Sequence, residues 1–169
     1  MAVTANVSLG VSGSQTSALD LGTVTFPFSA SAGTGFSTGT GAGQVDMVFT
    51  DTRTLSASAT ENLDLAGSLT GALGTTLTFA RIKAVFVSAA AANTNDVQVT
   101  RPASNGTAIF MAAGDGIALR PGAAFAWVSG SGDATGVAVT AGTGDLITVT
   151  NSAGTTSVTY TVVVLGCSA

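Results

Sequence analysis

The sequence contains no histidine and a single cysteine, Cys167, among its 169 residues. The lack of histidine excludes Ser-His-Asp and Cys-His nucleophilic catalysis, and also zinc sites of ordinary ligand composition. One cysteine excludes a disulfide within the chain, which fits synthesis in a reducing cytoplasm. The sequence therefore predicts a protein that is not an enzyme and that uses no metal or other cofactor.

Charge is also scarce. Charged residues make up 8% of the chain, against about 25% in ordinary soluble domains, and the formal net charge is −4. The basic residues are too scattered to follow a phosphate backbone, so no nucleic-acid partner is expected: Arg53, Arg81, Lys83, Arg101 and Arg120. A surface so poor in charge is a solubility risk for a lone monomer. We therefore expect neighbours in an assembly to cover much of it.

Long apolar runs are missing too. The mean hydropathy of +0.53 comes from alanine and valine spread through a threonine, serine and glycine background. No run approaches the roughly 20 apolar residues that a membrane helix needs. The first residues also lack the basic segment and apolar core of a signal peptide. No membrane partner is expected.

Residues 46–169 show the pattern of an all-β domain. Alternating apolar and polar side chains are interrupted by turn residues at intervals of roughly 8–12 positions, without long helical crossovers. This pattern predicts about eight strands in a jelly-roll-like antiparallel β-sandwich. The strand order, which separates a jelly roll from an immunoglobulin-like sandwich, stays open at this point.

A central strand is expected within Leu77–Ser88. Side chains along a strand point to opposite faces with a period of two. The alternation from residue 80 onward places Ile82, Ala84 and Phe86 on one face, which we predict to be the dry one. The other face begins with two basic residues and ends with two valines.

Two further strands are expected in the second half of the chain. Thr107–Met111 follows the turn signal Asn105-Gly106 and is expected to be a strand. Ser157–Leu165 is the expected last strand, with four residues directed inward: Val158, Tyr160, Val162 and Val164.

Residues 1–45 differ from the rest. Val7–Val11 and Thr23–Phe28 are predicted to be short extended pieces, and Pro27 confines the second to a sheet edge or to a non-sheet segment. Ser31–Gln44 has the glycine, serine and threonine composition of a linker. One interpretation is a flexible tail, and the other is an extended arm that orders on a neighbouring subunit. Aromatic residues dominate buried interface area, so the arm's anchors would be Phe26, Phe28 and Phe36.

The acidic residues offer no convincing acid–base pair. Glu61 and Asp64 fall on opposite faces of an expected strand, and Asp46 and Asp51 flank an apolar one. We interpret all four as surface or turn residues rather than as catalytic groups.

Three weaker candidates for a functional site remain. The oxygen-rich loops Asn93–Asp96 and Gly130–Asp133 suit a bound ion best, but neither follows the twelve-residue calcium loop. Trp127 and Tyr160 suit a sugar-binding face, yet on strands rich in valine and alanine they are more typical of a core. Cys167 is expected to be an incidental thiol beyond the last strand.

Several stretches resemble small virion proteins of tailed bacteriophages that decorate the head: Gly39–Asp46 running into Phe49–Leu55, Leu63–Gly67 through Phe79–Lys83, Ala141–Leu146 through Tyr160–Gly166, and the turn Arg120–Gly122. The resemblance implies a jelly-roll capsid decoration (cement) protein on the virion exterior, made in the bacterial host cytoplasm. It implies a homotrimer whose partner is the major capsid protein of the same virion. The alternative is another virion component, such as a tail tube, tail tip or host-glycan-binding head fibre.

Overall fold

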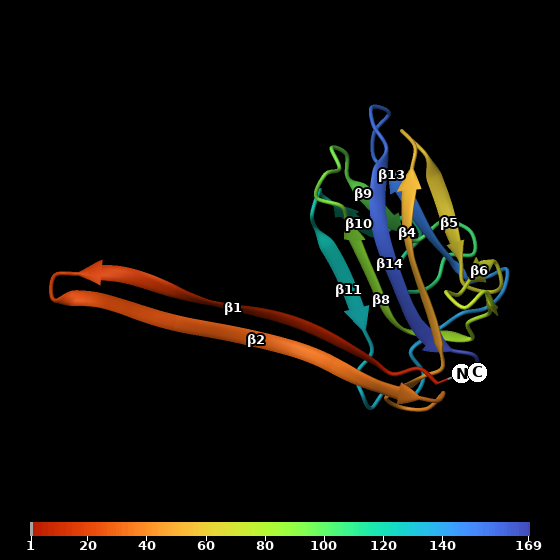
Figure 1. Cartoon of the computed structure of the whole chain (residues 1–169), viewed down its shortest axis with the longest axis horizontal. Coiled ribbons are helices and arrows are strands. Elements are labelled where there is room, and N and C mark those ends of the chain that lie inside the picture. Colours follow the sequence, from red (N-terminus) through yellow and green to blue (C-terminus); the bar gives the residue numbers. More distant parts are fainter. Residues whose placement is uncertain (1) are drawn as a thin grey trace.

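The computed structural model describes residues 2–169, and within that range the chain forms strands and turns but no helix. No helix that could cross a membrane is therefore found among these residues. The chain divides into a β-sandwich body and a hairpin that projects far from it (Figure 1). The predicted all-β class is confirmed.

Two antiparallel sheets, one of five strands and one of four, form the two layers of the body. One layer has the order β4 (Met47–Leu55), β14 (Val158–Cys167), β8 (Arg81–Ala89) and β11 (Ala124–Val128), and β12 (Val137–Ala138) also pairs with β8. The other has the order β5 (Thr60–Asp64), β13 (Leu146–Asn151), β9 (Val97–Thr100) and β10 (Gly116–Leu119). A small hairpin of β6 (Leu69–Thr70) and β7 (Thr76–Leu77) completes the body.

The pairing of the eight main strands follows a regular scheme. Along the chain, the first strand pairs with the last, the second with the seventh, the third with the sixth and the fourth with the fifth. These pairs alternate between the two layers. The body therefore has the connectivity of one long hairpin of strand pairs folded over on itself.

The core lies between the two layers. The last strand contributes Val158, Tyr160, Val162 and Val164, all fully buried, as its alternation predicts. The opposite layer contributes Leu63, Val97, Val99, Ile147 and Val149. Each fully buried valine, leucine or isoleucine side chain contributes about 1.5–3 kcal/mol relative to an exposed one. The alternation of these strands therefore explains why the two layers close on each other.

The prediction for the central strand is wrong in its phase. The pairing of β8 with β14 passes from Ala84 directly to Ile82, so that Lys83 is an extra, bulged residue. A bulge reverses the alternation on one side of it. As a result Val85 faces the core together with Ile82, whereas Phe86 lies on the outer face and is 39% exposed.

The strand expected at Thr107–Met111 is also absent. Residues 108–114 form turns and bends, and the segment pairs with β13 only at its start, where Gly106 makes an isolated bridge to Leu146. The guanidinium of Arg101 donates to the backbone carbonyls of Phe110 and Met111 at 3.0 and 2.9 Å. These bonds take the place of a ladder and hold the segment as a loop.

The first part of the chain is a long two-stranded hairpin, which we call the arm. β1 (Ala5–Leu19) pairs antiparallel with β2 (Gly22–Thr38) over its whole length, around a turn at Asp20 and Leu21. A strand of fifteen residues spans roughly 50 Å. After a loop, β3 (Gln44–Val45) adds a short parallel pairing to the end of β2.

The arm is a longer and more regular structure than the two short extended pieces predicted from the sequence. Its two short extended pieces are parts of longer, mutually paired strands, and much of the predicted linker belongs to β2. Pro27 lies in β2, which at this point has a neighbour on one side only, so the predicted edge position is confirmed.

Candidate interaction surface on the arm

The register of the arm separates its apolar and polar side chains onto two faces. Partners in an antiparallel ladder share a face, and faces alternate along each strand. One face therefore carries nearly every large apolar residue of the arm: Val7, Leu9, Val11, Leu19, Val24, Phe26, Phe28 and Phe36, with Ala5, Ala30 and Ala32 and three polar residues, Gln15, Ser17 and Thr34. The other carries Asn6, Ser8, Ser12, Ser14, Thr16, Thr23, Thr25, Ser29 and Ser31. The arm is an amphipathic ribbon.

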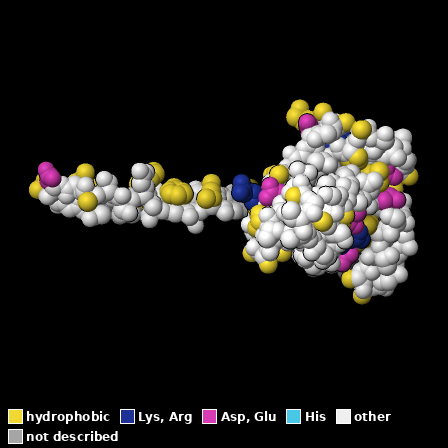
Figure 2. Space-filling model, turned by 90° about the horizontal axis from the view of Figure 1, so that it is seen from above, with side chains coloured by type: hydrophobic (Ala, Val, Ile, Leu, Met, Phe, Trp, Pro, Cys, Tyr) yellow, Lys and Arg dark blue, Asp and Glu magenta, His cyan; other side chains and the backbone are white. Residues whose placement is uncertain are grey.

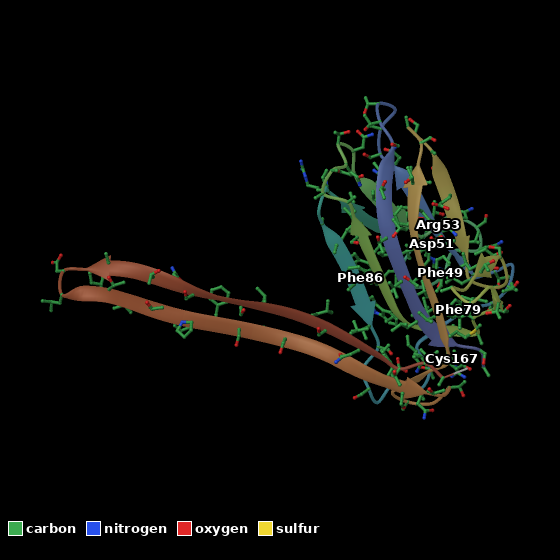
Figure 3. All side chains as sticks on the ribbon, in the orientation of Figure 1. Phe49, Asp51, Arg53, Phe79, Phe86 and Cys167 are labelled. Carbon is green, nitrogen blue, oxygen red and sulfur yellow. The ribbon has the colours of Figure 1, made fainter. Side chains whose placement is uncertain are left out.

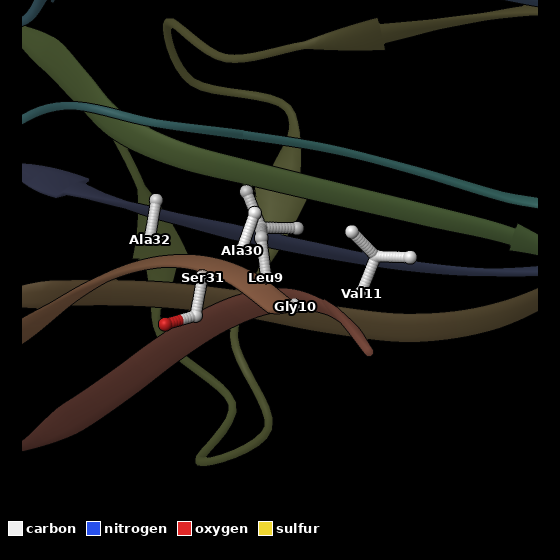
Figure 4. A pocket seen from close by; sticks show the side chains of 6 residues that line it. All are labelled: Leu9, Gly10, Val11, Ala30, Ser31 and Ala32. Atoms are coloured by element: carbon white, nitrogen blue, oxygen red, sulfur yellow. The ribbon is translucent and has the colours of Figure 1, made fainter. Parts of the chain in front are cut away.

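The apolar face is open to solvent beyond the base of the arm. Phe26 is 67% exposed and Phe28 is 47% exposed, although large apolar side chains are normally covered. Figure 4 shows a shallow depression on this face, where Leu9, Val11 and two alanines point to one side and Ser31 points to the other. Beyond the base, the chain itself therefore leaves the apolar face of the arm uncovered.

Charge is almost absent from this surface. Asp20, at the turn, is the only charged residue among residues 2–45. Figure 2 shows apolar side chains along the arm, an acidic side chain at its tip and most of the charged groups on the body. The arm therefore offers apolar contact and hydrogen bonds, and Asp20 is its only group able to form an ion pair.

The base of the arm shows how its apolar face packs. Phe36 and Val3 join Val45, Ala84 and Leu165 in a second buried cluster, separate from the main core. Half-buried Ala5 and Val7 from the arm, and Val48, Val128 and Val163 from the body, pack around this cluster. The apolar face of the arm is therefore seated on the outer face of the β4-β14-β8-β11 layer.

This seating assigns different places to the three predicted anchors. Phe36 is only 4% exposed and packs within its own chain, so it fixes the arm to the body. Phe26 and Phe28 lie on the projecting part and remain available to a neighbour. The sequence alone could not show that Phe36 is buried while Phe26 and Phe28 are exposed, because this difference depends on where the hairpin leaves the body.

Two threonines hold the base by hydrogen bonds. Thr34 donates its hydroxyl to the carbonyl of Ser129, directly after β11, at 3.0 Å. The hydroxyl of Thr38 both accepts from the N–H of Val3 and donates to its carbonyl, each at 2.9 Å. The arm therefore crosses the lower end of the layer and leaves it past β11, as Figure 1 shows.

A groove remains between the base of the arm and the body. It has a volume of about 520 Å³ and is lined by Ala5, Val7 and their neighbours on the arm and by Val48, Thr50, Phe86, Val163 and Leu165 on the body. Phe86 lies on the outer face of β8 (Figure 3). We call this feature the Phe86 groove.

Apart from Arg81 at the start of β8, which pairs with the outward Cys167, the outer face of this layer lacks charge. Its other outward positions, read from the registers, are Val48, Thr50, Thr52, Thr54, Ala84, Phe86, Ser88, Ala124, Ala126, Val128, Thr159, Thr161, Val163 and Leu165. Near the arm these residues are mainly apolar. Farther from the arm the outward residues are mainly threonines, which pair across strands, as in the hydrogen bond between the hydroxyls of Thr52 and Thr161 at 3.0 Å.

The ionisable groups of the body serve its structure. Arg53 on β4 binds both Asp51 and Glu61, and the Tyr160 hydroxyl donates to the other oxygen of Glu61 at 2.7 Å. Burial raises the pKa of Tyr160, and the bond to Glu61 adds to the rise. Asp51 and Arg53 lie on β4 beside Phe49 (Figure 3). The cluster joins the two layers at one edge.

The two oxygen-rich loops use their polar groups internally. In one, Asn95 donates to Asn151 at 3.0 Å inside the body, and Asn93 both donates to and accepts from the backbone of Thr159. In the other, Asp133 Oδ1 accepts from Gly136 and Thr135, which lowers the pKa of Asp133 to about 2. Within residues 2–169, no group of three potential metal-binding side chains is found.

Cys167 and Trp127 depart from their predicted roles. Cys167 is fully buried at the end of β14, with its Sγ 3.5 Å from the carbonyl oxygen of Gln44, so it is part of the junction between arm and body. Burial raises its pKa. Trp127 is half-buried in β11 and belongs to neither core cluster, whereas Tyr160 lies in the core.

Comparisons with protein-family models, with curated proteins and with solved structures find no match to this chain. A function must therefore be inferred from the amphipathic arm and from the outer face of the body.

Proposed function

We propose that this protein is a non-enzymatic structural subunit of a multicopy assembly, and specifically a decoration (cement) protein on the outside of a bacteriophage capsid. One observation carries the proposal: a hairpin roughly 50 Å long projects from the body, and beyond its base it exposes an uncharged face with most of its large apolar side chains. Exposed apolar patches of this kind mark protein interaction sites.

The energetics favour attachment through the arm. Burying a valine, leucine or phenylalanine side chain contributes about 1.5–3 kcal/mol, and the distal arm exposes several of them. The ladder between β1 and β2 already orders the backbone, so less conformational entropy is lost on binding. The lack of charge also avoids the cost of removing ions from water at a buried seam.

The strand pairing supports the specific form of the proposal. A long hairpin of four strand pairs, folded so that the pairs alternate between two layers, is the connectivity expected of a jelly roll, a fold used by viral capsid proteins. The protein would sit on the outer lattice of the major capsid protein as a homotrimer. Many copies would each add a modest contact, and together these contacts would resist internal pressure.

A tail or head-fibre component is the second candidate. The length of the projecting arm favours it, because such an element suits a fibre or a connector as well as a lattice. Binding to isolated tails, or to host cells or glycans, with no binding to capsid shells would support this candidate over the first.

The experiment is a binding and stability assay with shells that lack this protein. We expect the wild-type protein to co-sediment with shells at a saturating ratio and to raise the temperature at which they break. An arm-shortened variant, in which Asn-Gly replaces residues 9–32, keeps the paired base and should bind shells more weakly. Wild-type protein that neither binds nor stabilises the shells would overturn the capsid proposal.

A further inference from the structure

The apolar face of the distal arm (residues 9–32) has no cover within its own chain, and we propose that a second copy of this chain covers it. In this arrangement the distal arm of one copy lies across the outer face of the β4-β14-β8-β11 layer of the next. Its apolar side chains enter the Phe86 groove there. The inference rests on the proposed assembly role and identifies the partner of the arm.

The base of the arm already makes the kind of contact that we propose. There, the same face of the same hairpin packs on the same outer layer: Val7 and Phe36 lie with Ala84, Leu165 and their neighbours. The fold therefore already contains one contact between the apolar face of the arm and the outer face of the layer. The distal arm repeats its chemistry with Leu9, Val11 and the two phenylalanines.

The two free surfaces also match each other. The apolar face of the distal arm lacks charge up to the turn, and the outward positions around the Phe86 groove, on β4, β14, β11 and the Ala84–Ser88 part of β8, carry no charged residue. Neither surface offers a counterpart to a charged partner. Each is complementary to the other, and both are present on every copy.

The Phe86 groove has room for a side chain of the arm. Phe86 is 39% exposed beside Val163 in a space of about 520 Å³, bounded by the base of the arm. An incoming aromatic or aliphatic side chain would cover Phe86 without a new cavity being opened. Aromatic pairs also gain specific stabilisation when their rings pack offset or edge to face. Phe26 and Phe28 are the arm residues suited to this.

The direction of the arm makes the contact intermolecular. The base is fixed by the bond from Thr34 to Ser129, and the arm leaves the layer past β11, its edge strand. The distal face therefore lies beyond the edge of its own layer, where a neighbouring copy would sit. A contact of arm to layer is head-to-tail, and such contacts close into rings when the rotation permits, as in the proposed homotrimer.

Oligomeric state in the absence of shells tests the acceptor surface. We expect the wild-type protein to sediment as a discrete multimer and Phe86→Asp to sediment as a monomer at the same concentration. Thr54→Asp is the matched control, because it places the same charge on the same outer face but outside the groove. It should stay multimeric. A monomeric wild-type protein, or a multimer unaffected by Phe86→Asp, would overturn the inference.

Photo-crosslinking identifies what the arm touches. A photoreactive phenylalanine analogue replaces Phe28 in one chain, and this chain is mixed with ¹⁵N-labelled wild-type chains. We expect crosslinks from the unlabelled arm to labelled peptides of β8 or β14, and none when the analogue replaces Ser29 on the polar face. Crosslinks from arm to arm, which would mean that arms pack on each other, would contradict the inference, as would crosslinks within one chain only.

These outcomes are distinct from a failure of the capsid proposal. A multimer with crosslinks from arm to layer that binds no shell would contradict the capsid role and leave arm exchange supported. A monomer that binds shells would contradict arm exchange between copies and leave the capsid role supported.

Discussion

The ring of Phe28 lies over the backbone of Gly13, its partner across the arm. A Cβ placed on Gly13 would lie 2.6 Å from Cζ of the ring, closer than real Cβ contacts allow. The absence of a side chain at Gly13 therefore lets Phe28 lie flat along the apolar face. The two residues together shape the surface that we propose to be buried in the assembly.

Gly13→Ala should displace this ring and weaken self-association by about 2- to 10-fold, since moving a side chain off its preferred rotamer costs of order 0.5–1.5 kcal/mol. Gly10→Ala is the control, because a Cβ there meets Ser31 Cβ at an ordinary 3.7 Å. Sedimentation equilibrium measures both variants. Equal dissociation constants for the two would show that the position of Phe28 does not matter for association.

Tyr160→Phe should lower the free energy of unfolding by about 1.5–3 kcal/mol, because Glu61 loses a hydrogen bond to a charged group. Urea unfolding followed by circular dichroism measures the change. A loss below about 0.5 kcal/mol would mean that the bond between the layers contributes little.

The same residue predicts a pH dependence. The pKa of Tyr160 is raised in the folded protein by burial and by Glu61, whereas that of the unfolded chain is about 10. The folded state therefore keeps its proton longer, so stability is fully present below about pH 10 and falls as the pH rises above it. The chain has no other tyrosine, so Tyr160→Phe should show a weaker fall over this range. Parallel curves for the two proteins would contradict this.

Asp133 should titrate with a midpoint near 2 in a carboxyl-detected NMR experiment, because the N–H of Gly136, and then the hydroxyl and N–H of Thr135, stabilise its charged form. Its contribution to stability is present above about pH 3.9 and is lost as the pH falls through 2. A midpoint near 3.9 would show that the loop does not hold this geometry in solution.

Cys167 should resist thiol reagents in the folded protein. Its side chain is buried at the junction between arm and body, and burial raises its pKa, so little reactive thiolate is exposed. The colorimetric reagent DTNB should react fully in denaturant and only slowly without it. Rapid, complete reaction of the native protein would contradict the packing described for the junction.

Local pattern was sufficient to predict the all-β class and the inward residues of the last strand. In β14, strict alternation places Tyr160 and its neighbours in the core. Such alternation is decisive when one face of a strand is buried and the ladder is regular.

The local sequence pattern could not predict features that depend on pairing with distant parts of the chain. The bulge at Lys83 reverses the alternation of β8, and it shows only in the register between β8 and β14. The arm has the composition of a linker, yet it forms a ladder because each half supplies the other's partners. Apolar residues alternate along Val24–Ala32 and along Ala5–Val11, but only the register between β1 and β2 shows that the two sets lie on the same face.

The most direct test of the account compares Val11→Asp with Ser12→Asp by sedimentation velocity. The two variants place the same charge at adjacent positions of β1, the first on the apolar face of the arm and the second on the polar face. The account predicts that Val11→Asp is monomeric, while Ser12→Asp and the wild-type protein remain multimeric. Identical masses for all three proteins would contradict burial of the apolar face against another molecule.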